Sequence, residues 1–224
     1  MISFYKFSKI GRYIRFDNKE RRNKQKDAAI SVIWNLFTNN CQRNYEPSAY
    51  LTIDEQLCTT KGRCPFKSYI PTKPGKYGIK IWSICDAENA YFLNGQIYTG
   101  KIGNSPETNQ VERVVRELSQ KYLGTGRNIT TDNFFTTLQL AKYLLYRRTT
   151  LVGTVRKSRK FLPKEMCGNS TSTGSEFIFH DENFAIVRYT EKKGKSVTLL
   201  SSHHPGNTID PNGKPTIFKL LQPN

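Results

Sequence analysis

Two short stretches of this chain each carry one aspartate at the end of a run of apolar and β-branched residues. The first is LTIDEQL, residues 51–57, and the second is NITTDNFF, residues 128–135. Such runs predict buried strands, and a carboxylate there is costly unless it is paired or binds a metal. If parallel strands bring Asp54 and Asp132 together, the pair would form a divalent-metal site of the kind used in phosphoryl transfer.

Each aspartate also has a simpler interpretation, as a turn or helix-cap residue. Asp132 stands just before a helical pattern, and aspartate is favoured at the start of a helix. Two bare carboxylates side by side repel each other, which raises the pKa of at least one until a cation such as Mg²⁺ relieves the repulsion. The residues alone leave both interpretations open.

The charge balance points to a polyanionic partner. The chain has 224 residues, with 35 Lys and Arg against 18 Asp and Glu, and a net charge of +17. Nucleic acid is the usual partner of so basic a protein, although a merely soluble basic protein is the alternative. The length fits one domain, or one domain with an insertion.

The cysteines and the apolar runs exclude several classes of protein. Five cysteines occur, with no C-x-x-C spacing, so neither a zinc site nor a disulfide framework is predicted. We expect reduced, mostly buried thiols of an intracellular protein. The N-terminus lacks the apolar segment of a secretory signal, and no apolar run approaches the roughly 20 residues of a membrane span.

The order of predicted elements indicates an α/β fold with a mixed sheet. Helices are predicted at 27–40, 111–122 and 136–147, and strands at 50–57, 77–85, 90–93, 96–99, 128–131 and 150–155. Asn94-Gly95 is the strongest hairpin-turn signal among them. Antiparallel strands followed by βα units give a mixed sheet flanked by helices, an order that the ribonuclease-H-like fold shares.

Two groups of basic residues are candidates for binding DNA phosphates, with a plain solvated face as the alternative. The first follows the strand at 150–155, which ends on the same side as the acids, and comprises Arg156, Lys157, Arg159 and Lys160. The second surrounds the first hairpin and comprises Arg63, Lys67, Lys73 and Lys76. The adjacent pair His203-His204 is expected in a surface loop, because neighbouring strand residues face opposite ways and cannot readily share a metal.

The composition changes after Arg156, and short strands are predicted at 177–179, 185–189 and 197–201, with a flexible loop at 167–175. We therefore predict four parts. They are an N-terminal helical segment at 1–45, a catalytic core at 46–156, a small β-rich insertion at 157–212 and a C-terminal tail at 213–224.

Three sequence blocks, in this order, carry a family resemblance. They are LTIDEQL followed by KGRCPFKSYIPTKPGKYGIKIW, then RNITTDNFFTTLQLAKYLL from Arg127, and LVGTVRKSRK from Leu151. On these blocks the chain resembles the piggyBac transposases and the piggyBac transposable element-derived proteins, from about Arg12 to Pro215. The match is far more specific than a pair of acids.

The resemblance implies a ribonuclease-H-like core that cleaves and transfers DNA strands with two Mg²⁺ ions. Asp54 and Asp132 match the first and second catalytic aspartates of the family's D-D-D triad, and thus its metal ligands. Arg156 and Arg159 fall where the family has basic residues near DNA, and 157–212 matches its insertion domain. We expect a nuclear protein whose partner is DNA, either transposon ends or nonspecific duplex, and for which a homodimer is one possible assembly.

The third aspartate of the triad has no match in this chain. In the family it follows a Lys-Gly-Gly-Val segment that comes after Gly-Lys-Pro, whereas here Gly213-Lys214-Pro215 is followed by a different sequence. Asp181 and Asp210 precede this junction and do not match it. We therefore expect a core truncated at its C-terminus and no transposition by this chain alone. The alternatives are a non-catalytic DNA-binding remnant and a fragment of a decaying element.

Overall fold

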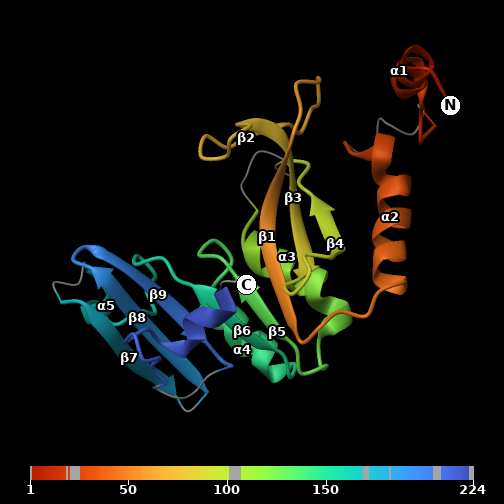
Figure 1. The fold of residues 1–224 in the computed structure, drawn as a ribbon. Helices are drawn as coiled ribbons and strands as arrows, with labels where there is room; N and C mark the ends of the chain where they lie inside the picture. The colour runs from red at the N-terminus through yellow and green to blue at the C-terminus, as the bar shows by residue number, and fades with distance from the viewer. Residues whose placement is uncertain are drawn as a thin grey trace.

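A mixed nine-stranded sheet forms the centre of the molecule (Figure 1). The computed structural model describes residues 2–18, 20, 26–100, 107–168, 172–181, 183–203 and 208–221. The strands follow the spatial order β2-β3-β1-β5-β6-β9-β8-β7, and β4 pairs with β3. Their bounds are β1 Tyr50–Thr59, β2 Ser68–Tyr69, β3 Tyr77–Asp86, β4 Phe92–Ile97, β5 Asn128–Thr131, β6 Thr150–Thr154, β7 Gly174–Asp181, β8 Phe184–Lys192 and β9 Lys195–Ser201.

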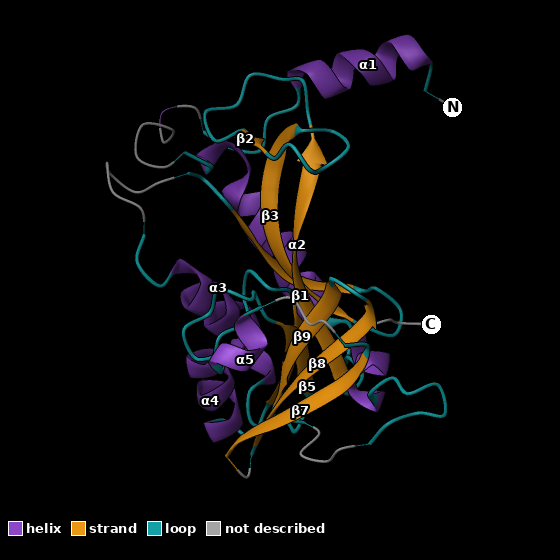
Figure 2. Cartoon of the chain, turned by 90° about the vertical axis from the view of Figure 1, so that its left-hand side faces the viewer, coloured by secondary structure: helices purple, strands orange, loops and turns teal. Residues whose placement is uncertain are grey.

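Most helices of the described residues flank this sheet, whereas the first one stands apart from it (Figure 1). The helices are α1 Phe4–Tyr13, α2 Ala28–Arg43, α3 Gln110–Ser119 with the 3₁₀ turn η2 Gln120–Tyr122, α4 Leu138–Tyr146, α5 Lys164–Cys167 and the 3₁₀ helix η3 Thr216–Leu221. Figure 2 shows α3, α4 and α5 on one side of the strands. In the part of the chain described, no helix has both the length and the apolar character that crossing a bilayer requires.

The two halves of the sheet are built differently, as the sequence predicts. Strand β1 is antiparallel to β3, which is antiparallel to β4. On its other side β1 is parallel to β5, and β5 is parallel to β6. Parallel neighbours need a crossover, and α4 supplies it between β5 and β6. The predicted mixed α/β sheet is therefore confirmed.

The core lies where α3 and α4 cover the central strands. Leu51 and Ile53 of β1 are fully buried and pack with Val115 of α3 and with Leu140 and Leu144 of α4. The alternation of apolar residues along β1 puts Leu51 and Ile53 on the covered face, so Asp54 lies on the other face. Burial of this apolar surface is the main force that fixes the register of the central strands.

The prediction of a hairpin turn at Asn94-Gly95 is wrong. Both residues lie inside β4, where Gly95 pairs with Ser83 and Asn94 with Ile84. The chain turns instead between Asp86 and Tyr91, with Ala90 in the left-handed region at φ 59°. Gly95 is needed in the strand because a Cβ atom there would lie 2.9 Å from the ring of Phe92. The turn-forming dipeptide was outweighed by this packing.

The predicted helix at 27–40 is present as α2, but it is buried less than expected. Its Trp34 donates a hydrogen bond to the carbonyl oxygen of Gly95 at 3.0 Å, and Phe37 stacks on Phe92. Thr38 is its one fully buried residue, whereas Ile33 and Leu36 are exposed. Helix α1, within the segment 1–45 that was predicted to be helical, has no buried residue.

Strands β7, β8 and β9 form the predicted β-rich segment and continue the same sheet. Strand β9 is antiparallel to β6 and joins them to the core. A second cluster of buried residues holds η3 against this region through Ile217 and Phe218. The division of the chain into a core and an insertion stays a prediction. Residues 169–171 of the loop predicted at 167–175 lie outside the described residues.

The cysteines differ from the expectation of mostly buried thiols. All five are free, as predicted, but Cys58 and Cys167 are exposed and the other three are half-buried. The strands that carry Cys58 and Cys85 alternate between a covered and an open face, so apolar character alone does not decide which side a cysteine takes.

Candidate active site

The strand register brings the two aspartates together. Strands β1 and β5 run parallel, and their last paired residues are Ile53 and Thr131. Asp54 is the next residue of β1, and Asp132 is the first residue after β5. Both therefore stand at the same edge of the sheet, on the face opposite to Ile53.

Asp132 ends β5 in a tight turn that its own side chain stabilises. Its Oδ1 accepts hydrogen bonds from the backbone N–H groups of Phe134 at 2.9 Å and Phe135 at 3.3 Å. Its backbone oxygen accepts the hydroxyl of Thr136 at 2.7 Å. Helix α4 begins only at Leu138, with Thr137 as its N-cap. Asp132 thus caps the turn before α4 rather than the helix itself.

Opposing influences act on the pKa of Asp132. Burial raises the pKa of Asp132, and the nearby charge of Asp54 raises it further. The two backbone N–H groups and Arg156 act in the opposite direction but do not offset these effects. An acid with a raised pKa beside a second acid is the electrostatic pattern of a cation site.

The carboxylate oxygens of the two acids are suitable ligands for a hard divalent cation. Asp54 uses Oδ1 to accept the N–H of Glu55 at 2.7 Å, and Asp132 uses Oδ1 within its turn. The second oxygen of each has no protein partner among the described residues, which leaves two oxygen donors of the kind that Mg²⁺ takes together with water. No group of three or more His, Cys, Asp or Glu residues suited to a metal ion occurs in the same part of the chain.

A glycine that the sequence analysis missed allows the Asp132 turn to pack. Gly153 of β6 is buried directly beside Thr131 and Thr136, whose hydroxyls are 2.8 Å apart. A Cβ atom at Gly153 would lie 2.1 Å from the Thr136 hydroxyl and 2.6 Å from that of Thr131. A glycine inside a β-branched strand signals a close approach of this kind.

The basic residues after β6 reach the same turn. Arg156 donates through Nε to the side chain of Asn133 at 2.9 Å, and Arg159 donates to the backbone oxygen of Phe134 at 3.3 Å. Burial lowers the pKa of Arg159, and the charge of Arg156 lowers it further. Lys157 is half-buried and Lys160 is exposed. The structure thus places this basic group beside the second aspartate.

Lys80 of β3 is a further cation at the site that the sequence analysis missed. Its ammonium lies 4.3 Å from the ring centroid of Tyr98, 4.6 Å from that of Trp82 and 5.9 Å from that of Phe134. Burial lowers the pKa of Lys80 against the opposing charge of Glu55. A lysine within the apolar strand YGIKIWSIC was the available signal, because lysine is rarely buried without a partner.

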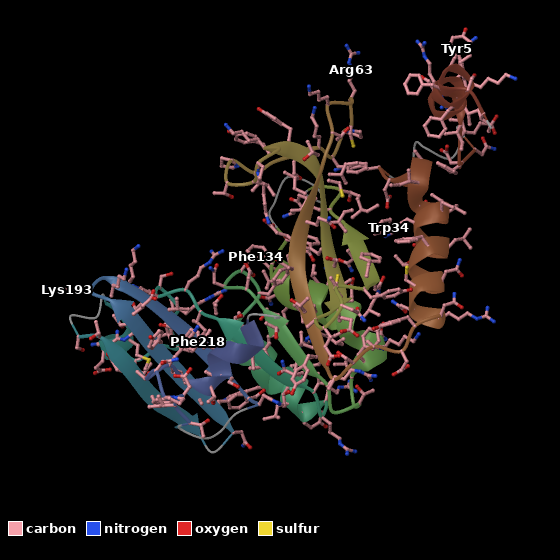
Figure 3. The ribbon with its side chains drawn as sticks, in the orientation of Figure 1. Tyr5, Trp34, Arg63, Phe134, Lys193 and Phe218 are labelled. Carbon is pink, nitrogen blue, oxygen red and sulfur yellow. The ribbon has the colours of Figure 1, made fainter. Side chains whose placement is uncertain are left out.

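Of the second basic group, Arg63, Lys67, Lys73 and Lys76, one residue reaches the strand of Asp54 and the others do not. Lys73 donates to the backbone oxygen of Glu55 at 3.3 Å and so reaches the residue after Asp54. Lys67 instead donates to Gly62 within its own loop. Figure 3 shows Arg63 at the tip of this loop, pointing away from the sheet. Lys76 is exposed in the following turn, with φ 51°.

The remaining polar candidates lie elsewhere. His203 lies in a bend after β9, as expected for a loop residue, but it is half-buried, and its Nδ1 is 3.1 Å from the hydroxyl of Thr150. Its neighbour His204 lies outside the described residues. Asp210 accepts the backbone N–H groups of Asn212 and Lys214 in its own turn. The side chain of Asp181 is also outside the described residues.

Comparison with known proteins adds independent findings. A DDE-type family model described as Transposase IS4 matches residues 1–216. The piggyBac transposase, in a cryo-EM structure of its synaptic complex with hairpin DNA, is 39% identical with a TM-score of 0.88, over 97% of this chain. The chain spans 47% of that transposase. Its mixed sheet matches the ribonuclease-H-like catalytic core there.

Two nucleases resemble the chain much less. Endonuclease V from Bacillus subtilis is 11% identical with a TM-score of 0.33, over 80% of this chain and 79% of the nuclease. Endonuclease V from Ciona intestinalis, in complex with a DNA that contains inosine, is 14% identical with a TM-score of 0.29, over 78% and 82% of the two chains. Likeness at this level says nothing about the function of this chain.

Proposed function

The chain belongs to the Transposase IS4 family of DDE transposases as a piggyBac-like catalytic domain, and from this premise we propose that Asp54 and Asp132 hold divalent metal at a DNA-processing site. The observation that carries the proposal is the parallel pairing of Ile53 with Thr131, which sets the two acids next to each other. Bound Mg²⁺ would activate the attacking oxygen and stabilise the leaving oxygen of a phosphodiester.

The protein's own residues would position the metal and the DNA strand. The backbone N–H groups of Phe134 and Phe135 hold one oxygen of Asp132, so its other oxygen stays directed away from the turn. Asn133 and Arg156 are hydrogen-bonded to each other at the rim of the site. A guanidinium there supplies positive charge for a backbone phosphate close to the metal.

DNA would be held mainly by charge. The net charge of +17 is large enough to make binding to a phosphate backbone strongly salt-dependent. Arg156, Lys157, Arg159 and Lys160 are the proposed contacts beside the acids. Arg63, Lys67 and Lys76 are the proposed contacts further along the duplex, with Lys73 between the two groups. We propose the nucleus as its place of action and a second copy of the chain as its protein partner.

We further propose that the chain by itself binds DNA without cutting it. Two carboxylates face each other at the site, and no group of three metal-ligating side chains occurs among the described residues. In-line displacement with two metals needs a fuller set of ligands. A non-catalytic DNA-binding protein is therefore the second function that this arrangement favours.

The test combines metal binding with DNA binding on the purified chain. Titration with Mn²⁺, followed by electron paramagnetic resonance, should show binding that Asp54→Asn and Asp132→Asn each weaken about tenfold or more, because half of the protein ligands are lost. The matched control is Glu191→Gln, an exposed acid at the end of β8. Equal Mn²⁺ binding by all four proteins would refute the metal site.

The DNA arm uses fluorescence polarisation with a labelled duplex and a duplex closed by a hairpin, over a series of salt concentrations. We expect affinity to fall steeply with salt for both, and Arg156→Gln to reduce the salt slope by about one. Strand cleavage in Mg²⁺ by the chain alone would contradict the proposal that it does not cut. Failure to bind either DNA at low salt would contradict the proposed function as a whole.

A further inference from the structure

A cavity of about 660 Å³ opens beside the Asp132 turn. Its walls come from residues 137–142, at the start of α4, and from residues 158–161, in the loop after β6. Arg159 of the second wall donates a hydrogen bond to the backbone oxygen of Phe134, which lies two residues after Asp132. The cavity is therefore adjacent to the proposed metal site but does not include either aspartate.

The lining of the cavity is cationic. Lys142, Arg159 and Lys160 contribute three positive charges, and no acidic residue is among the lining residues. The Nε atom of Arg159 is buried and has no hydrogen-bond partner in the described part of the chain. Lys142 and Lys160 are exposed, so a ligand can reach their ammonium groups. Positive charge on an accessible, concave surface favours an anionic ligand.

The start of α4 adds to the positive potential of the cavity. Thr137 caps the helix by accepting the N–H of Leu140 at 3.0 Å. The first N–H groups of a helix, here those of Leu138 and Gln139, have no acceptor within the helix. They carry the positive end of the helix dipole toward the same space.

One side of the cavity is apolar, which decides between a simple anion and a larger ligand. Phe161 and Leu138 line it, and both pack with their inner parts against the hydrophobic core. A small inorganic anion would bind the cationic side chains but would not contact the apolar side of the cavity. An unpaired nucleotide would contact both, because its phosphate binds cations and its base stacks on an aromatic ring.

We propose that this cavity binds one unpaired nucleotide of a DNA strand. Its phosphate lies among Lys142, Arg159 and Lys160, and its base lies against Phe161. Arg159 joins this subsite to the Asp132 turn through Phe134, so an occupied cavity positions the strand next to the acids. The inference rests on the proposed function, because it assumes that DNA is the ligand of the adjacent site.

The experiment compares two DNA probes on the full chain. One is a short blunt duplex, and the other is the same duplex with a single-stranded extension that carries the fluorescent base 2-aminopurine. The variants are Lys142→Gln and Phe161→Leu, where leucine keeps an apolar side chain against the core. The matched control is Lys193→Gln, an exposed lysine in the turn between β8 and β9, which Figure 3 shows at the far end of the molecule.

We expect the chain to bind the extended DNA more tightly than the blunt DNA and to quench the fluorescent base on binding. Phe161→Leu should abolish the quenching and weaken the binding of the extended DNA about tenfold, as the loss of one stacked base does. Lys142→Gln should weaken the binding of the extended DNA about fivefold and reduce the salt dependence (slope) of that binding by about one. Neither variant should change blunt-duplex binding more than Lys193→Gln does.

The outcomes separate this inference from the proposed function. Equal affinity for the two probes together with unquenched fluorescence would overturn the nucleotide subsite while leaving DNA binding intact. Absence of binding to both probes would overturn the proposed function and the subsite together. If circular dichroism shows Phe161→Leu to be unfolded, the quenching by the unaltered chain and the effect of Lys142→Gln decide the question.

Discussion

Asp86 and Asp132 stand at the ends of strands in the same sheet, yet their surroundings are opposite. Asp86 is fully buried, and its two oxygens accept four hydrogen bonds, from the hydroxyl of Tyr45, both the N–H and the hydroxyl of Ser48, and the N–H of Glu88. Asp132 is half-buried, accepts two backbone N–H groups on one oxygen and faces Asp54.

The pKa values of the two acids move in opposite directions for this reason. Burial by itself raises the pKa of Asp86, but its four hydrogen bonds outweigh burial and leave the pKa below the usual value. Burial and the charge of Asp54 leave the pKa of Asp132 above it. One acid is an anchor that the fold satisfies completely, and the other is kept short of partners, as a cation site requires.

Substitution of Asp86 should have the largest effect on the free energy of unfolding. Asp86→Asn loses one acceptor oxygen and leaves buried donors unpaired, so we expect a loss of about 2–4 kcal/mol in the free energy of unfolding at neutral pH. Urea unfolding measures it. The control is Glu88→Gln, whose exposed side chain is two residues away and should change stability by less than about 0.5 kcal/mol.

The pH dependence of the stability of Asp86→Asn tests whether the charge of Asp86 is the cause of the loss. A lowered pKa in the folded state contributes stability above the unfolded pKa and loses it as pH falls through the folded pKa. The gap between the unaltered chain and Asp86→Asn should therefore narrow below about pH 4. A gap that is constant with pH would show that packing, and not the charge of Asp86, stabilises this end of the sheet.

A substitution behind the Asp132 turn should have a smaller effect. Gly153→Ala forces a methyl group against the hydroxyls of Thr131 and Thr136, so we expect a loss of about 1–3 kcal/mol and a shifted turn. Thermal unfolding and Mn²⁺ titration measure the two consequences. Gly168→Ala is the matched control, because a Cβ atom at Gly168 meets no other atom within 4 Å. Unchanged Mn²⁺ affinity in Gly153→Ala would mean that the turn does not position the acid.

Removing the charge of Asp132 should have the smallest effect and the opposite sign to that of Asp86→Asn. A raised pKa in the folded state destabilises the protein above that pKa, and the effect disappears below the unfolded pKa. Asp132→Asn keeps an oxygen for Phe134 and Phe135, so we expect a gain of up to about 1 kcal/mol at neutral pH, reduced by solvent screening at this half-buried site. The gain should vanish below about pH 4.

Denaturant unfolding across this pH range, without divalent metal, is the measurement. Loss of stability in Asp132→Asn at neutral pH would abolish the contrast with Asp86, because both acids would then be anchors. Addition of Mn²⁺ should reverse the order of stability between the unaltered chain and Asp132→Asn, since only the unaltered chain keeps both carboxylates.

Much of the part of the sheet that carries Asp54 was predictable from local patterns. Alternating apolar residues indicated β1 and β3, and the helical spacing of Val114, Val115 and Leu118 indicated α3. The continuation of β4 through Asn94-Gly95 was not predictable, because this dipeptide favours a hairpin turn in isolation but here lies within the strand against Phe92 and Trp34. Such competition between local preference and packing cannot be seen in a window of sequence.

The residues of the candidate site likewise include some that the sequence predicted and some that it did not. Both aspartates were identified from strand ends and from the family blocks around them, whereas Lys80, Gly153 and the anchor Asp86 were missed. Each of these three depends on atoms supplied by other strands or by distant parts of the chain. The nucleotide cavity was missed for the same reason, since α4 and the loop after β6 form it jointly.

By itself, the sequence determined the type of most core elements, the basic character of the surface and the two acids that mark the family. Periodicity, charge and motif spacing are properties of neighbouring residues, so they can be read before the chain folds. Only the tertiary structure decided which acid is satisfied and which is not. Asp86 and Asp132 differ in the groups that the sheet register brings to them, and those groups come from residues far apart in the chain.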